Sequence, residues 1–287
     1  MATLRDLKRQ IASVKNIAKV TEALQTVSAV KFRKAEARVK RARPYAENVE
    51  QMMRDVARSA GESSPLLAGR EGNRVAVASI TADRGLAGGF NAQVLRTTAR
   101  LRRERGNDAI QVASGRKAVA FFRFRRVELR EVYTGFSDSP TYEQAREIGH
   151  TLTKLFNDEE ADEVYLVYNR FESALTQRPV VKRLIPVATE EGEEEDDGGA
   201  SFMEYVPDAD TILRKLVPRY VETMVWQALL ESAAGEHGAR MTAMKNATDN
   251  ANELAKDLTL AMNKARQAQI TREISEIAAG AEALSAG

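Results

Sequence analysis

A glycine-rich turn is the stretch of this chain whose residue types come closest to known chemistry. Asp83-Arg-Gly-Leu-Ala-Gly-Gly-Phe-Asn91 follows the short apolar run Val75–Ile80, as phosphate-binding turns follow a strand. Gly85, Gly88 and Gly89 do not have the G-x-G-x-x-G spacing, and no glycine-lysine-serine/threonine sequence completes a phosphate loop. A structural turn that requires positive φ is therefore favoured over a phosphate cradle.

The other side-chain types offer no convincing active site. The chain has no cysteine, which excludes disulfides, thiol catalysis and thiolate metal sites. Its two histidines are His150, expected on a helix, and His237, within Gly235-Glu-His-Gly238. Each of those glycines weakens a helix by about 1 kcal/mol relative to alanine, so a bend or a close approach is favoured over metal binding. No G-x-S-x-G elbow, H-E-x-x-H helix or carboxylate pair stands out. We expect no catalytic, cofactor-binding or metal-binding residue.

An acidic run, Glu190–Asp197, lies in the low-complexity segment 190–199. Its like charges repel one another and it has nothing to bury, so the pattern predicts a mobile loop. A calcium-binding patch is the alternative interpretation. The run lacks the alternating ligand spacing and the closing glutamate of an EF-hand.

Residues 70–205 have the pattern of an α/β domain with a mostly parallel sheet, because strand-like and helix-like runs alternate. Asn91 is expected to cap the first of its helices. Lys182, Arg183 and Pro186 suit an exposed edge strand. The expected strands are Val75–Ile80, Ala109–Ala113, Val127–Val132, Glu163–Tyr168 and Val180–Val187. The expected helices are 91–105, Lys117–Phe124 and Tyr142–Phe156.

The C-terminal segment, 208–287, reads as one long helix. Steps of three and four residues from Met241 trace a heptad seam of small and flexible apolar side chains, which is typical of a closely packed coiled coil. Such a helix needs a partner helix. The seam consists of Met241, Met244, Thr248, Ala251, Ala255, Leu258, Met262 and Ala265, and a second stripe follows at Ile270, Ile274, Ile277, Ala281 and Leu284.

The N-terminal segment, 1–60, supplies the partner helix. Thr3 is expected to cap it, with Asp6 in the first turn, and Pro44 predicts a kink or a short break. The fold class is therefore α/β: a long antiparallel coiled coil of N- and C-terminal helices with an inserted Rossmann-like α/β domain. The apolar steps along this segment are Leu4, Leu7, Ile11, Val14 and Ala18, with Leu24 and Val27 one residue out of step.

Many basic side chains lie on the N-terminal segment, between Lys8 and Arg43. A solvated helix face is the favoured interpretation and a nucleic-acid interface the alternative, but aromatic residues are nearly absent and no base-reading motif accompanies the charge. Over the whole chain 43 basic and 41 acidic residues nearly balance. No apolar run approaches the ~20 residues that cross a bilayer, so we expect a cytoplasmic protein that could dock on a membrane complex.

The chain resembles the gamma subunit of rotary ATP synthases. The clearest match is the C-terminal stretch Ile270-Thr-Arg-Glu-Ile-Ser-Glu-Ile-Ala-Ala-Gly-Ala-Glu-Ala283. Further matches, in the family's order, are Ile11–Ala35, Asp83–Asn91 and Glu236–Glu253. This sequence departs from the family in the acidic run and at Ala87, where many members have cysteine. The signature positions matched are Ile270, Thr271, Glu273, Glu276, Gly280, Ala281 and Ala283.

The resemblance implies a central stalk that turns inside a ring of three alpha and three beta subunits. The inserted domain would sit against the c-ring, with an epsilon subunit alongside, on the cytoplasmic face of the cell membrane. The stalk itself would bind no nucleotide, no cofactor and no nucleic acid, and it would touch the membrane only through the complex. The same resemblance implies that Arg266, Gln267, Thr271 and Glu273 contact the beta subunits.

Overall fold

The computed structural model describes residues 3–60, 65–70, 72–106, 108–187 and 209–285. Two long helices, α1 (Leu4–Ala60) and α6 (Ala209–Ser285), flank a series of shorter elements. These are α2 (Pro65–Ala68), β1 (Val75–Ile80), α3 (Phe90–Arg105), β2 (Ile110–Ser114), α4 (Arg116–Phe124), β3 (Leu129–Tyr133), α5 (Tyr142–Asn157), β4 (Glu163–Phe171) and β5 (Gln177–Ile185). The acidic run and the segment around it, 188–208, lie outside the described residues.

The sheet has the order β3-β2-β1-β4-β5 and is mostly parallel, as predicted. β1 runs parallel to β2 and β4, and β2 runs parallel to β3. β5 is antiparallel to β4 and lies at the edge, as its charged residues and proline indicated. All six residues of β1 are buried, which confirms a strand covered on both faces.

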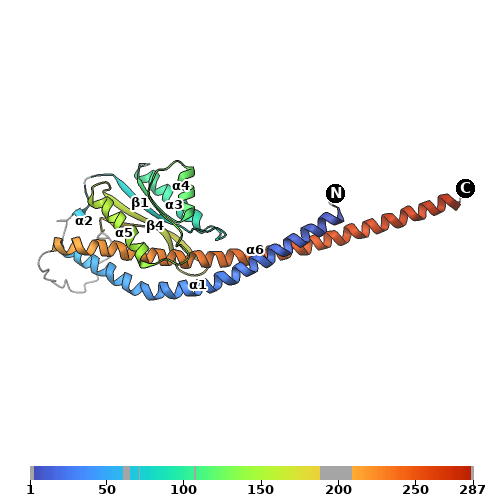
Figure 1. Cartoon of the computed structure of the whole chain (residues 1–287), viewed down its shortest axis with the longest axis horizontal. Coiled ribbons are helices and arrows are strands. Elements are labelled where there is room, and N and C mark those ends of the chain that lie inside the picture. Colours follow the sequence, from blue (N-terminus) through green and yellow to red (C-terminus); the bar gives the residue numbers. More distant parts are fainter. Residues whose placement is uncertain (1–2, 61–64, 71, 107, 188–208, 286–287) are drawn as a thin grey trace. The chain divides into compact units, whose positions relative to one another are not determined.

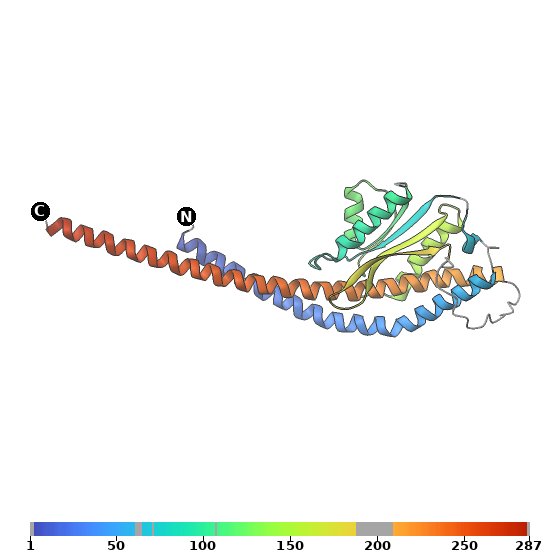
Figure 2. The same cartoon turned by 180° about the vertical axis from the view of Figure 1, so that it is seen from behind.

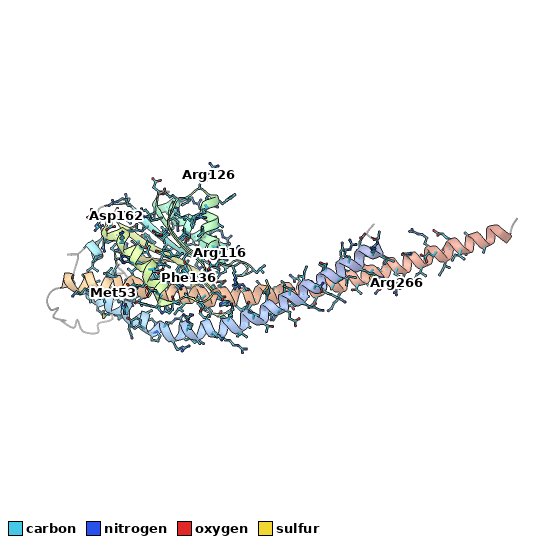
Figure 3. The ribbon with its side chains drawn as sticks, in the orientation of Figure 1. Met53, Arg116, Arg126, Phe136, Asp162 and Arg266 are labelled. Atoms are coloured by element: carbon cyan, nitrogen blue, oxygen red, sulfur yellow. The ribbon has the colours of Figure 1, made fainter. Side chains whose placement is uncertain are left out.

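Helices cover both faces of this sheet (Figures 1 and 2). On one face α3 and α4 pack through Val94, Leu101 and Phe122. On the other face, side chains of α1, α5 and α6 join the largest apolar cluster of the chain. Met53 of α1 is fully buried there, and Figure 3 shows it at the base of the domain. The second face thus binds both long helices to the sheet by apolar packing.

Two compact units divide the chain. The larger, Ser28–Arg240, holds the sheet and the adjoining parts of α1 and α6. The smaller consists of the remaining ends, Met1–Val27 and Met241–Gly287. In this smaller unit the predicted seam of α6 is confirmed: Met244, Ala251 and Ala255 are buried and the other seam residues are partly buried.

The seam of α1 differs from the prediction at one point. Val27 is 53% exposed, whereas Thr21 and Ser28 are buried. The hydroxyl of Thr21 lies 2.6 Å from that of Thr248 on α6 and also donates to a carbonyl oxygen of its own helix. Small hydroxyl residues therefore continue the heptad without a phase shift. The prediction at Val27 was wrong because it sought only apolar side chains.

Helix α1 is continuous through Pro44, so of the two outcomes expected there, a kink or a short break, the break was wrong. Figure 1 shows the helix curving rather than interrupted. Pro44 lies on the exposed face, where water can bond the carbonyl that a proline leaves without a donor. The expected cap is confirmed, since the Thr3 hydroxyl accepts from the Asp6 N–H at 3.2 Å and the Asp6 carboxylate accepts from Thr3.

The seam of α6 ends where its partner helix begins. Counting away from the Thr21–Thr248 contact, antiparallel pairing puts Leu4 opposite Ala265, which is the last partly buried seam residue. From residue 266 to residue 281 every side chain of α6 is exposed. The predicted second stripe is part of this stretch: Ile274 is 62% exposed and Ile277 is 72% exposed.

Replacing Ala251 with leucine should lower the melting temperature of the chain. Ala251 is buried in the seam, so the larger side chain must displace its neighbours. Overpacking of a well-packed site costs about 1–3 kcal/mol. Thermal unfolding followed by circular dichroism measures the effect. The matched control is Asn252→Leu, at the exposed neighbouring position. Equal melting temperatures for the two variants would contradict this seam.

Candidate functional site: the filled crevice of the sheet and the exposed end of α6

Helix α6 occupies the crevice where α/β domains commonly hold ligands. Such ligands bind outside the carboxyl ends of the strands, at the point where the strand order reverses, which in this sheet is at β1 and β4. Here the carboxylate of Glu231 accepts from the backbone N–H of Phe171, the last residue of β4, at 3.0 Å. The guanidinium of Arg240 donates to the carbonyl of Gly85, beyond β1, at 3.1 Å. Residues 231–240 of α6 thus span the crevice.

Little empty space remains at this edge in the part of the chain that the structure describes. A cavity of about 10 Å³ lies between the ends of β1 and β2 and α6, with Thr81, Ser137, Ser232 and Glu236 in its wall. That volume is close to the minimum that holds one water molecule. Glu236 is 1% exposed and pairs with Arg240 at 2.6 Å. A nucleotide could enter only if α6 moved out, which argues against an enzyme acting at this crevice.

The glycine-rich turn serves as a connector between loops. The Asp83 carboxylate accepts from the backbone N–H groups of Arg116 at 3.0 Å, Gly135 at 2.8 Å and Ser137 at 3.1 Å. Burial raises the pKa of this carboxyl, but the three N–H donors more than offset it and hold the pKa below its ordinary value. Figure 3 labels Arg116, the first residue of α4, and Phe136, in the loop that follows β3. The carboxylate of Asp83 thus joins the segments that follow β1, β2 and β3.

The backbone of this turn agrees in part with the prediction. Gly88 has positive φ (54°), and so does Leu86 (62°), which the sequence did not indicate. Asn91 was predicted to cap α3, and that prediction was wrong. The helix begins at Phe90 with Gly89 as N-cap, and the Asn91 side chain accepts from the N–H of Ala82 at 2.8 Å. Asn91 instead fastens its helix to the end of β1.

The two histidines lie in different environments. His150 is exposed on α5. His237 is 1% exposed and its Nε2 faces two oxygens of Asp138, the carbonyl and the carboxylate, each at 3.3 Å. Among the described residues no three histidine, aspartate or glutamate side chains gather where they could hold a metal ion. The close approach predicted at the flanking glycines is present: a Cβ on Gly235 would lie 2.9 Å from the Phe90 ring.

Basic residues of α1 that favoured a nucleic-acid interface are partly used within the chain. Lys31 pairs with Asp138, and Arg38 donates to the carbonyl of Pro140 at 2.5 Å. Arg43 lies 3.6 Å from Glu231 and donates to the carbonyl of Phe171 at 3.2 Å. These side chains fasten α1 to the α/β domain, which weakens the nucleic-acid interpretation.

The four residues predicted to contact a partner all lie on the exposed end of α6. Arg266 is labelled there in Figure 3. The hydroxyl of Thr271 donates to the carbonyl of Gln267 at 3.0 Å, and Gln269 donates to Glu273 at 2.9 Å. The Thr271 hydroxyl and the Glu273 carboxylate are thus bonded within their own helix, and the side chains of all four residues are exposed. The signature residues Ile270, Thr271, Glu273, Glu276, Gly280 and Ala281 are exposed on this end, and Ala283 lies in the same helix.

Sequence reasoning missed the polar residues that close the crevice. Glu236 and Arg240 stand four residues apart, a spacing that could have indicated an ion pair on a helix. Asp83 and Asp138 gave no comparable signal, because their partners lie between 33 and 107 residues away in the sequence. The structure also contains, among its described residues, no helix long and apolar enough to cross a membrane.

Replacing Gly235 with alanine should destabilise the chain although alanine is the better helix former. The gain in helix propensity is about 1 kcal/mol, whereas forcing a methyl group against the buried Phe90 ring costs about 1–3 kcal/mol. Gly280→Ala is the matched control in the same helix, because a Cβ there meets nothing within 4 Å. Denaturant titration should show a loss for the first variant and a gain for the second. A higher free energy of unfolding for both variants would contradict the close contact between Gly235 and Phe90.

The stability of the chain should fall as the pH drops below about 6.5, the ordinary pKa of histidine. Burial lowers the pKa of His237 and outweighs the contacts with Asp138 and Glu236 that raise it. Below this pH the unfolded chain binds a proton at His237 that the folded chain does not bind. The free energy of unfolding therefore falls by up to about 1.4 kcal/mol for each pH unit. Denaturant titrations between pH 5 and pH 8 measure the slope. His237→Gln should flatten it, and an unchanged slope in that variant would contradict this assignment.

Comparison with known proteins is consistent with this arrangement. A family model described as ATP synthase matches residues 3–284. The ATP synthase gamma chain of Rubrobacter xylanophilus is 72% identical over 291 residues, covering 100% of both chains, and that of Moorella thermoacetica is 49% identical over 99% of this chain and 100% of its own. A chain in a cryo-EM structure of Euglena gracilis mitochondrial ATP synthase has the same fold, with a TM-score of 0.70 at 19% identity over 99% of this chain and 95% of that one. This protein therefore belongs to the family of ATP synthase gamma chains.

Proposed function

We propose that this chain is the central-stalk subunit of a proton-translocating ATP synthase and that it couples rotation of the c-ring to the conformational cycle of the catalytic beta subunits. The observation that carries the proposal is the end of α6. Its residues 266–281 form a helix that no other described residue covers, and they expose Ile270, Ile274 and Ile277. A row of exposed isoleucines on a lone helix is typical of a protein interface.

The partners proposed are three alpha subunits, three beta subunits, an epsilon subunit and the c-ring. The surrounding alpha and beta subunits would cover the exposed end of α6. A stalk can drive such neighbours only through contact energies that differ between their conformations. One uneven helix face turning within a ring satisfies that condition, because each neighbour meets a different set of side chains at each angle.

Specific contacts to the beta subunits are proposed for Arg266, Gln267, Thr271 and Glu273. Arg266 is exposed and can pair with a carboxylate. The Thr271 hydroxyl donates within its own helix and so presents only its lone pairs to a partner. Glu273 retains acceptor capacity beyond its bond from Gln269. Complementary charges at such a contact chiefly set its specificity and orientation.

The chain itself would be non-catalytic, with the nucleotides held by other subunits. The support is geometric, since α6 fills the crevice at the carboxyl edge of the sheet with its own side chains. The complex would lie on the cytoplasmic face of the cell membrane, and this chain would be a peripheral part of it.

Removing residues 270–287 should weaken coupling more than assembly. The truncated chain keeps the whole seam through Ala265 but loses most of the exposed end. We expect it to purify with alpha and beta subunits at one copy per three of each. ATP-driven proton pumping in vesicles, measured relative to ATP hydrolysis, should fall several-fold.

The control truncation removes only residues 284–287 and should pump normally. A complex that lacks residues 270–287 but pumps with full efficiency would exclude the contacts proposed for Thr271 and Glu273. Failure of the intact chain to purify with alpha and beta subunits would contradict the proposed function itself.

A further inference from the structure

The segment between β3 and α5 touches both long helices through one side chain, Asp138. Its carboxylate accepts a hydrogen bond from the ammonium of Lys31, on α1. The other carboxylate oxygen lies 3.3 Å from Nε2 of His237, on α6. The backbone carbonyl of Asp138 lies at the same distance from that nitrogen. One residue of the α/β domain thus bonds both helices.

The tautomer of His237 follows from these neighbours. Both atoms that face Nε2 are oxygens that accept, so Nε2 carries the proton and donates. Nδ1 is then an acceptor, and among the described residues it has no partner. Burial lowers the pKa of this imidazole, and the ring is neutral at pH 7. The bond from His237 to Asp138 is therefore directional and does not depend on a charge on the ring.

Neighbouring residues extend the attachment on both sides. Arg38 of α1 donates to the Pro140 carbonyl at 2.5 Å and to the Ser139 hydroxyl at 3.3 Å. On the opposite side the N–H of Ser137 donates to Asp83 at 3.1 Å, within the turn that follows β1. Four consecutive residues, 137–140, therefore connect the loops of the sheet to the helices.

The position of this attachment along the helices gives it a mechanical meaning. Lys31 and His237 each lie within three residues of the limits of the larger unit, Ser28 and Arg240. Elsewhere the join combines the large apolar cluster with hydrogen bonds at the carboxyl edge of the sheet, such as those of Glu231 and Arg240. Apolar burial is non-directional, so a helix held by it can rotate slightly against the surface on which it packs. Hydrogen bonds, in contrast, weaken steeply when their angle changes.

We propose that Asp138 is a positioning residue that locks both long helices to the α/β domain and thereby stiffens the transmission of torque between them. This inference rests on the proposed function. Loss of the lock leaves the fold and the active sites on other subunits in place. It softens the connection between the part of the chain that would be driven by the c-ring and the part that would drive the beta subunits.

A single-molecule measurement tests the lock in the assembled complex. The chain has no native cysteine, so Phe124→Cys, at an 89% exposed position of the α/β domain, provides one attachment point for a probe. The alpha and beta subunits are fixed to a surface, rotation is arrested by withdrawing ATP, and the angular variance of the probe is recorded. This variance reports the stiffness between the domain and the held helices.

Asp138→Ala should increase the angular variance about twofold, because two of the five directional contacts from segment 137–140 to the helices are lost. Asp138→Glu, which keeps the carboxylate, should restore much of the stiffness. The melting temperature of the complex should change by less than about 3 °C, since partly exposed ion pairs contribute little to stability. Lys31→Met removes the bond from Asp138 to α1 and leaves its bond to α6, so this variant should give an intermediate variance. It keeps the test decisive if the alanine variant assembles poorly.

Glu160→Gln is the matched control. It removes an ion pair of comparable exposure, to Arg130, that lies wholly within the α/β domain. Equal angular variance in Asp138→Ala, Lys31→Met and Glu160→Gln would overturn the lock. Absence of ATP-driven rotation in the wild-type complex would instead refute the proposed function, and the two failures are therefore distinguishable.

Discussion

Burial of residues 231–240 of α6 against the carboxyl edge of the sheet is the constraint on which the larger unit depends. Gly235 and Gly238 allow the helix backbone to approach Phe90 and the backbone of Ala174. Glu231 then bonds the backbone N–H of Phe171 at the end of β4, and Arg240 bonds the carbonyl of Gly85 in the turn after β1. The crevice that serves ligands in other α/β domains serves here to attach a helix. An α/β domain held in this way is suited to carry load.

The smaller unit follows a different rule. Its helices approach closely because the seam of α6 is built mostly from alanine, methionine and threonine, and because Thr21 continues the seam of α1. α1 ends its cover of α6 near Ala265, and beyond that point α6 presents isoleucine to solvent. Paired helices give stiffness, and an uncovered end gives a surface for neighbours. The two features together suit a stiff axle whose exposed end is contacted by surrounding subunits.

Periodicity was enough to predict the long helices, the five strands and the α6 seam, because repeated local patterns carry that information. It failed where one residue decided the outcome. Val27 lies outside the seam because hydroxyl residues took the inner positions, Asn91 bonds the end of β1 rather than capping α3, and Pro44 is accommodated on an exposed helix face. The attachments of Asp83 and Asp138 join residues far apart in sequence, and no local pattern encodes them.

Native-state hydrogen exchange of the amides at 231–240 tests the central claim most directly. If α6 is an integral part of the crevice, these amides should exchange only through global unfolding, at the same free energy as those of β1 and β4, and adding nucleotide should not change their rates. Exchange through a local opening of lower free energy, or protection that increases when a nucleotide is added, would show that the helix leaves the crevice to admit a ligand. That result would contradict the account.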